Sequence, residues 1–205
     1  MKSNKLLAKS ITLGLILAMP YGDVSADEIT YDNGWYKQEF SGVSGNDLVF
    51  TNSSVSLDSS KIDGANSITF NGALSFYGTG AEIKNTGKLV TGGKLTNSAA
   101  ISVSTLGDEE HRSEVFNGSG ATITVDNAVI GVLTNNGTFT VNKNLDIITA
   151  SANGITNNGK LTVTGNIEVD AGMRGIQNGG TISANQINLQ ESLENKSGAT
   201  ITVNE

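Results

Sequence analysis

The densest group of side chains that could do chemistry lies in the segment Leu106–Glu114. It holds four carboxylates together with the only histidine of the chain and an arginine, namely Asp108, Glu109, Glu110, Glu114, His111 and Arg112. Carboxylate oxygens bind hard cations such as Ca²⁺, and a pair of carboxylates can cleave a glycosidic bond. A single loop is a poor support for two groups that must keep a fixed geometry. We therefore interpret the segment as a solvated loop, keep a cation site and a catalytic site as alternatives, and assign no catalytic, cofactor-binding or metal-binding residue.

A second group consists of threonine pairs that alternate with apolar residues. The pairs are Thr122/Thr124, Thr138/Thr140, Thr162/Thr164 and Thr200/Thr202, with Thr181/Ser183 in the equivalent place. Regular threonine columns on a flat β face resemble those of ice-binding proteins. The high strand propensity of threonine explains the pairs without any ligand, so ice binding is kept only as an alternative.

The composition excludes several classes of site. The 205 residues include no Cys, one His, and 20 acidic against 13 basic residues, for a net charge of −7. Without Cys there is no disulfide, thiolate metal site or Cys nucleophile, and a single His removes most histidine-based metal sites and triads. An acidic chain with few aromatic residues lacks the basic stripe of a nucleic-acid-binding protein. We expect no nucleic-acid partner and no cofactor.

The chain begins with the pattern of an export signal. Three lysines precede the apolar run Ile11–Met19, and a polar stretch then ends in the small residues Val24–Ala26. This order predicts a Sec-type signal peptide over residues 1–26, cleaved after Ala26. The apolar run is shorter than the about 20 residues that span a bilayer. We therefore expect an exported protein without a transmembrane segment in its mature part, at the cell surface, in the outer membrane or outside the cell.

Most of the remaining sequence is a repeat built around an Asn and a Gly. The five clearest copies are Val115–Val125, Leu133–Val141, Ile155–Val163, Ile176–Ala184 and Leu193–Val203. Their anchoring glycines lie 17, 22, 21 and 18 residues apart, at Gly120, Gly137, Gly159, Gly180 and Gly198. Each copy has a short apolar piece ending at Asn, a glycine corner, and a strand in which apolar residues alternate with polar ones.

This repeat predicts an all-β fold, a right-handed parallel β-helix of about 20-residue coils over residues 43–205, with coils about 4.8 Å apart. An antiparallel sandwich is the alternative. The recurring asparagines should lie above one another and hydrogen-bond along an inward corner of the coils. They are Asn117, Asn135, Asn157, Asn178 and Asn195.

Two regions depart from the repeat, and the sequence ends in the middle of a repeat. Residues 27–42 hold four aromatic side chains and are expected to form an N-terminal cap over the first coil. The spacing of 33 between Gly87 and Gly120 predicts an inserted charged loop near residues 106–114. The last segment, Thr200–Glu205, would leave an apolar coil with open strand edges. We expect the sequence to be the beginning of a longer protein or a truncated remnant.

The signal, the Cys-free body and the Asn-Gly-Thr repeats resemble the passenger region of Gram-negative autotransporters, most strongly over Val115–Val203. The resemblance implies a β-helix that a C-terminal β-barrel carries across the outer membrane, to stay on the surface or be released, often as an adhesin. After residue 80 the only aromatic residues are Phe116 and Phe139, whereas a barrel needs aromatic girdles. A longer chain or a separate partner would have to supply the translocator.

We therefore expect an exported, non-catalytic β-helical protein with an adhesive or structural role. Its expected partner is a glycan or a protein of a host or cell surface. A polysaccharide-acting β-helix enzyme is the alternative by fold analogy, followed by an ice-binding protein. Carboxylates that converge in a groove would favour the enzyme, and a flat, evenly spaced threonine face would favour ice binding.

Overall fold

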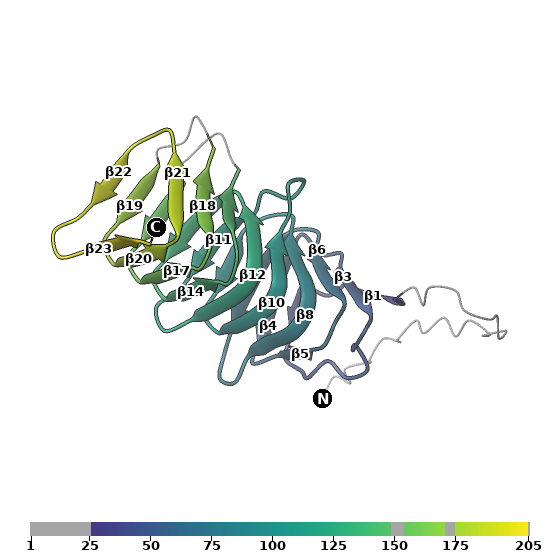
Figure 1. The fold of residues 1–205 in the computed structure, drawn as a ribbon. Helices are drawn as coiled ribbons and strands as arrows, with labels where there is room; N and C mark the ends of the chain where they lie inside the picture. The colour runs from purple at the N-terminus through teal and green to yellow at the C-terminus, as the bar shows by residue number, and fades with distance from the viewer. Residues whose placement is uncertain (1–25, 149–153, 171–174, 205) are drawn as a thin grey trace.

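The computed structural model describes residues 26–148, 154–170 and 175–204, and this part of the chain forms a rod of stacked coils (Figure 1). The described residues contain 23 strands and no helix. The strands pair in parallel with the equivalent strands of the coils before and after them. The fold is thus the all-β parallel β-helix that the repeat predicts, whereas the predicted signal peptide lies outside the described residues except for Ala26.

The coils build three faces, and a typical coil contributes one strand to each face in turn. Face 1 consists of β5 (Lys61–Asp63), the first halves of β8 (Glu82–Thr91), β10 (Ala100–Gly107) and β12 (Thr122–Ile130), and then β14 (Thr138–Val141), β17 (Lys160–Val163), β20 (Thr181–Ala184) and β23 (Thr200–Val203). Face 2 consists of β1 (Glu28–Tyr31), β3 (Asp47–Phe50), β6 (Ser67–Phe70), the second halves of β8, β10 and β12, and then β15 (Leu145–Ile147), β18 (Asn166–Val169) and β21 (Gln186–Leu189).

Face 3 is a separate sheet of nine strands. It consists of β2 (Trp35–Tyr36), β4 (Ser54–Asp58), β7 (Ala73–Tyr77), β9 (Leu95–Asn97), β11 (Glu114–Asn117), β13 (Val132–Asn135), β16 (Ile155–Asn157), β19 (Ile176–Asn178) and β22 (Leu193–Asn195). Faces 1 and 2 belong to one sheet because β8, β10 and β12 run through the corner between them.

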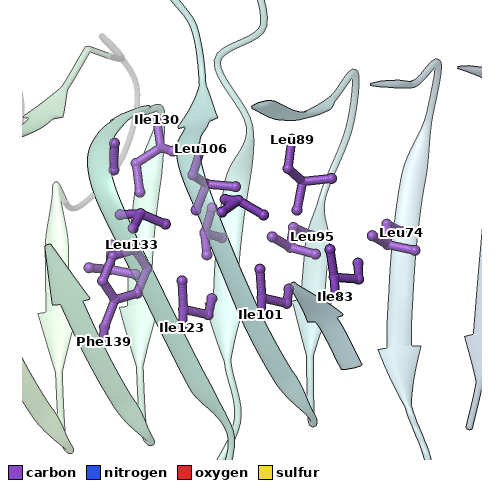
Figure 2. Packing of buried hydrophobic residues seen from close by; sticks show 14 of the residues in the cluster. Leu74, Ile83, Leu89, Leu95, Ile101, Leu106, Ile123, Ile130, Leu133 and Phe139 are labelled. Atoms are coloured by element: carbon purple, nitrogen blue, oxygen red, sulfur yellow. The ribbon is translucent and has the colours of Figure 1, made fainter. Parts of the chain in front are cut away.

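The alternation of apolar and polar residues sets which side chains enter the core. On face 1 the inward residues of neighbouring strands stand opposite one another and are almost completely buried: Ile83, Ile101, Ile123, Phe139 and Leu161. Figure 2 shows part of this column beside the inward leucines of face 3. Burying each such side chain contributes about 1.5–3 kcal/mol, so the stacked columns are the main source of stability.

The predicted asparagine column is confirmed. Its side chains point inward from the ends of the face 3 strands, and it is one residue longer than predicted. Each side-chain Nδ2 donates to the Oδ1 of the asparagine in the next coil, at 2.8–2.9 Å, along Asn97, Asn117, Asn135, Asn157, Asn178 and Asn195. All but the last are fully buried. The same Nδ2 groups also donate to backbone carbonyls of the next coil, as Asn135 does to Lys160 at 3.0 Å. Because the amides are hydrogen-bonded throughout, the core tolerates this polar column.

The glycines next to this column are required by close stacking. A Cβ added to Gly159 would lie 2.1 Å from the carbonyl oxygen of Gly137, and one added to Gly180 would lie 2.1 Å from that of Gly159. These three glycines do not have positive φ angles, whereas Gly120 and Gly198, in longer corners, have φ of 76° and 82°. The short corners therefore need glycine for space, and only the longer ones need it for a left-handed backbone.

The segment expected to be a cap, residues 27–42, forms β1 and β2, which pair with β3 and β4 as part of the first coil. Three of its rings surround Phe50, with centroids 4.8, 5.5 and 5.9 Å away, namely Tyr31, Tyr36 and Phe40. Phe50 in turn stacks on Phe70 at 4.4 Å. Trp35 does not join them, because its side chain points outward and is 51% exposed. Three of the four aromatic residues of this segment thus pack on Phe50 as part of the first coil.

The charged segment joins β10 to β11 in a coil of ordinary length. Asn97 and Asn117, on either side of it, are 20 residues apart, and the next coils measure 18, 22, 21 and 17 residues at the same column. Gly87 lies within β8, whereas Gly120 lies at the corner before β12. The spacing of 33 therefore compares glycines from different corners of the coil.

Candidate functional site

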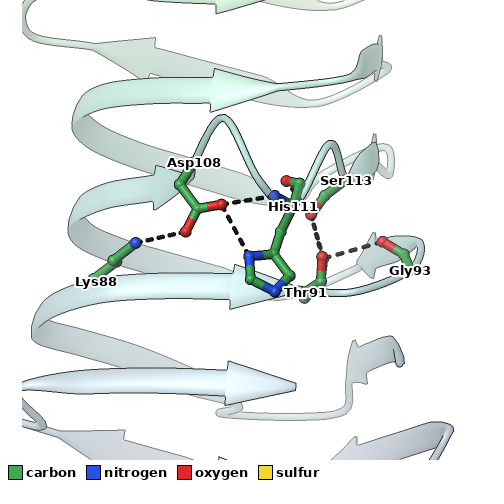
Figure 3. Close-up of polar contacts among 6 residues, drawn as sticks. All are labelled: Lys88, Thr91, Gly93, Asp108, His111 and Ser113. Atoms are coloured by element: carbon green, nitrogen blue, oxygen red, sulfur yellow. Dashed lines mark hydrogen bonds and ion pairs between the residues drawn. The ribbon is translucent and has the colours of Figure 1, made fainter. Parts of the chain in front are cut away.

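Asp108 is the centre of the contacts in the charged loop (Figure 3). Its Oδ2 accepts a hydrogen bond from Lys88 Nζ at 2.6 Å, and its Oδ1 accepts one from the His111 backbone N–H at 2.7 Å. The Nδ1 of the His111 ring lies 2.9 Å from the same Oδ1. Burial alone would raise the pKa of Asp108, but the hydrogen bonds from Lys88 and His111 outweigh it and lower the pKa to about 2. Asp108 is therefore an anion at neutral pH and fixes the loop.

His111 and Ser113 supply the other residue types of a catalytic triad, but not its geometry. The buried Ser113 hydroxyl donates to the Thr91 carbonyl at 2.5 Å and accepts from the Thr91 hydroxyl at 2.8 Å (Figure 3). It reaches His111 only at the backbone carbonyl, 3.5 Å away. Ser113 thus attaches the end of the loop to β8 rather than facing a general base.

The remaining carboxylates of the loop do not converge. Glu109 and Glu110 are exposed, and Glu114 pairs with Lys94 of the preceding coil at 2.9 Å. Within the described ranges, no group of three or more His, Asp or Glu side chains is placed to hold a metal ion. The loop therefore offers neither a cation cage nor a pair of acidic groups aimed at one point.

A pair of carboxylates that the sequence did not single out lies on face 2. Asp146 of β15 stands directly opposite Glu168 of β18. Burial, followed by the charges of Glu168, Asp170 and Glu109, raises the pKa of Asp146. Glu168 instead accepts a hydrogen bond from Asn188 Nδ2 at 2.6 Å. Each acid lies between two apolar residues, so the sequence predicts that it points outward, but only the register of the coils brings the two together.

Two shallow depressions lie on the outer surface of the rod. One, of about 350 Å³, is lined by Glu168 of this pair and by Asp170, Asn188 and Gln190, together with neighbouring apolar residues. The other, of about 190 Å³, lies at the corner between faces 1 and 2 and is lined mainly by hydroxyl and amide side chains, including Ser102, Ser104, Thr124 and Asn142. Only the first depression combines polar lining with two neighbouring carboxylates.

The threonines of face 1 form one continuous column and one interrupted column. The continuous column is Ser102, Thr124, Thr140, Thr162, Ser183 and Thr202. In the other column Lys160 stands between Thr138 and Thr181, and Thr164 lies beyond the end of β17. The predicted pair Thr162/Thr164 is therefore wrong, because on β17 Lys160, and not Thr164, occupies the second column beside Thr162. A lysine within the second column breaks the flat hydroxyl surface that ice binding would require.

Comparisons with protein-family models, curated proteins and solved structures find no match to this chain. No helix in the described ranges is long and apolar enough to cross a membrane. What the protein does must therefore be inferred from its residues and their geometry.

Proposed function

We propose that this chain is an exported, non-catalytic β-helical protein, the passenger part of an autotransporter with an adhesive or structural role. The observation that carries the proposal is the asparagine ladder from Asn97 to Asn195, which is buried up to Asn178 and runs through the later coils without a break. Coils that contact mainly their neighbours make a rod, and a rod displays long outer faces to partners. The proposed partners are a glycan or protein of a host or cell surface and an outer-membrane translocator.

Export by the Sec pathway is proposed from the basic, apolar and small-residue order of residues 1–26. The test is to express the full chain with a C-terminal tag in a Gram-negative host and sequence the N-terminus of the tagged product. We expect a product that begins at Asp27 and leaves the cytoplasm. The control is Leu15→Arg, which places a charge in the apolar run and should hold the chain inside. An uncleaved, cytoplasmic product would contradict the proposal.

The adhesive role is tested with the exported chain coupled to beads. We expect saturable binding of the beads to epithelial cells or to bacteria that display the same chain. Beads coated with a β-helix enzyme of similar size and charge provide the control. Binding no greater than that of the control beads would leave a structural role and contradict the adhesive one.

A polysaccharide-acting enzyme is the second candidate, favoured by the carboxylate pair on face 2. Glycoside hydrolysis uses two carboxyl groups whose environments push their pKa values apart. In this assignment Asp146, whose pKa is raised, would act as the acid and Glu168 as the second carboxyl group. The test is reducing-end release from neutral and acidic polysaccharides. Activity that Asp146→Asn and Glu168→Gln abolish, but Asp126→Asn does not, would establish the enzyme; no release would exclude it.

A further inference from the structure

The outward-pointing aromatic rings of the rod all lie on face 3. They are Trp35 on β2, Tyr77 on β7 and Phe116 on β11. Trp35 is 51% exposed and Tyr77 is 37% exposed. Every other aromatic ring in the described ranges packs in the core or against its N-terminal end. Trp35 and Tyr77 therefore present two large aromatic surfaces on one face of the rod, and such side chains are enriched where proteins contact a partner.

The register gives these rings a regular spacing along the rod. Trp35 begins one column of outward side chains, and Phe116 follows after three hydroxyl residues, Ser56, Ser75 and Thr96; the column continues beyond Phe116 with Thr134. Tyr77 lies in the middle coil, two residues farther along its strand than Ser75. Since adjacent strands lie about 4.8 Å apart, successive rings are about 10 Å apart along the axis. The rings are thus separated from one another by hydroxyl side chains.

The charges on this surface cancel in pairs. Lys37 Nζ lies 3.3 Å from Asp58, next to the position of Trp35, and Lys94 Nζ lies 2.9 Å from Glu114. The Lys94 ammonium also lies 5.8 Å from the centre of the Phe116 ring. A surface with paired charges attracts neither an acidic nor a basic partner over a distance. Its ligand should therefore be uncharged.

We propose that face 3 of the first five coils binds an uncharged oligosaccharide. The C–H faces of two sugar rings would stack on Trp35 and Tyr77, and the sugar hydroxyls would exchange hydrogen bonds with the hydroxyls of Ser56 and Ser75. A protein partner fits this surface less well, because protein interfaces bury a contiguous apolar centre, whereas these rings are separated by serines. This inference deepens the proposed adhesive function and rests on it.

The single tryptophan of the chain makes the site directly observable. The exported full chain is screened on an array of neutral and of sialylated or sulfated oligosaccharides, and each bound oligosaccharide is then titrated while Trp35 fluorescence is recorded. We expect binding of neutral oligosaccharides with a saturable change in the Trp35 emission. Binding to charged oligosaccharides alone would overturn the proposal, as would the absence of binding to every oligosaccharide on the array.

Substitutions locate the binding surface. Trp35→Ala and Tyr77→Ala should each weaken binding on the array about tenfold, as truncation of an aromatic contact residue does. The control is Leu193→Ala, which removes another exposed apolar side chain, 47% exposed, at the far end of face 3. It should leave binding unchanged. Circular dichroism checks that all variants fold. Unchanged binding in both aromatic variants would overturn the proposal.

The bead assay separates this inference from the proposed function. If beads coated with Trp35→Ala chain adhere as well as wild-type beads, adhesion stands and the face-3 site is wrong. If wild-type beads do not adhere while the array still shows Trp35-dependent binding of neutral oligosaccharides, the site stands and the adhesive function is wrong.

Discussion

The inward column behind face 3 is filled in two different ways along the rod. The first coils place Tyr36, Leu57 and Phe76 in it, and every later coil places an asparagine there. The change occurs between adjacent coils, where Phe76 stands opposite Asn97. At this junction the Asn97 Oδ1 accepts a hydrogen bond from the Ala99 N–H at 3.0 Å, because the coil before it offers no amide. The same inward position can therefore hold packed apolar side chains in one series of coils and hydrogen-bonded amides in the next. Each series makes its own contacts between neighbouring coils.

The outer surfaces of the same two regions also differ. In the described ranges, every ion pair joins residues between Lys37 and Glu114. In the later coils two carboxylates, Asp146 and Glu168, stand opposite each other instead. The first region thus compensates charge between neighbouring coils, and the second relies on hydroxyls and amides. The two regions should respond differently to core truncation and to acid.

The largest effect is expected from opening the aromatic core of the first coils. Phe70 is fully buried and stacks on Phe50 at 4.4 Å. Phe70→Ala should lower the free energy of unfolding by about 3–5 kcal/mol, because it removes the ring and leaves a cavity. Urea unfolding followed by circular dichroism measures the change. Tyr77→Ala, which truncates an exposed ring, should cost less than about 1 kcal/mol; equal losses in the two variants would show that the ring stack does not support this region.

The corresponding substitution in the later coils is Asn135→Ala. It removes the acceptor of one Asn117 Nδ2 hydrogen bond, although Asn117 keeps its bond to the Thr138 carbonyl, and it removes the donor to the Asn157 Oδ1 inside the core. Leaving buried polar groups unpaired should cost about 2–4 kcal/mol. The matched control is Asn195→Ala at the exposed end of the ladder, which should cost less than about 1 kcal/mol. If both variants lose the same free energy of unfolding, each asparagine contributes independently and the ladder is not a connected network.

The sequence could predict the later coils well because their copies share the Asn, the Gly and the alternating strand. The alternation in Leu161–Val163 fixes which side chains point inward, and stacking copies on their asparagines yields the ladder. In the earlier coils the same Asn-Gly pair occurs at a different corner. Asn71 follows β6 on face 2, and Asn85 lies within β8 with a φ of 50°. A short turn motif is equally favourable at several corners, so it cannot fix the register by itself.

The candidate sites depended on that register and were therefore harder to predict. Lys88 and Asp108 are 20 residues apart in the sequence and meet only because their coils are adjacent. Asp146 and Glu168 meet for the same reason. The acidic composition of the loop predicted a solvated segment, but it gave no signal that Ser113 would be buried beneath it. Predicting a contact between two coils requires the number of residues in each coil. That number varies because the corners differ in length.

A smaller effect, and a dependence on pH, is expected from the ion pair of the first region. The pKa of Asp108 is about 2 in the folded chain, below the about 3.9 of an unfolded Asp. Its contribution is therefore present above about pH 4 and is lost as the pH falls towards 2. Since the pair is partly exposed, Asp108→Asn should cost about 0.5–1 kcal/mol at pH 7. Urea unfolding at several pH values should show the difference shrinking in acid; a constant difference would indicate lost packing instead.

The smallest effect, with the opposite sign, is expected from Asp146 in the second region. Burial and the neighbouring charges, Glu168 first among them, raise the pKa of Asp146, so its ionised form destabilises the folded chain at neutral pH. That cost disappears as the pH falls through the folded pKa, because the folded chain then takes up the proton before the unfolded chain does. Asp146→Asn should therefore stabilise the protein at pH 7 by a few tenths of a kcal/mol, roughly what one like-charge pair across strands costs. Urea unfolding at pH 7 and in acid measures it, and a loss of stability at pH 7 would mean that Asp146 has a favourable partner and that the second region compensates its charges as the first does.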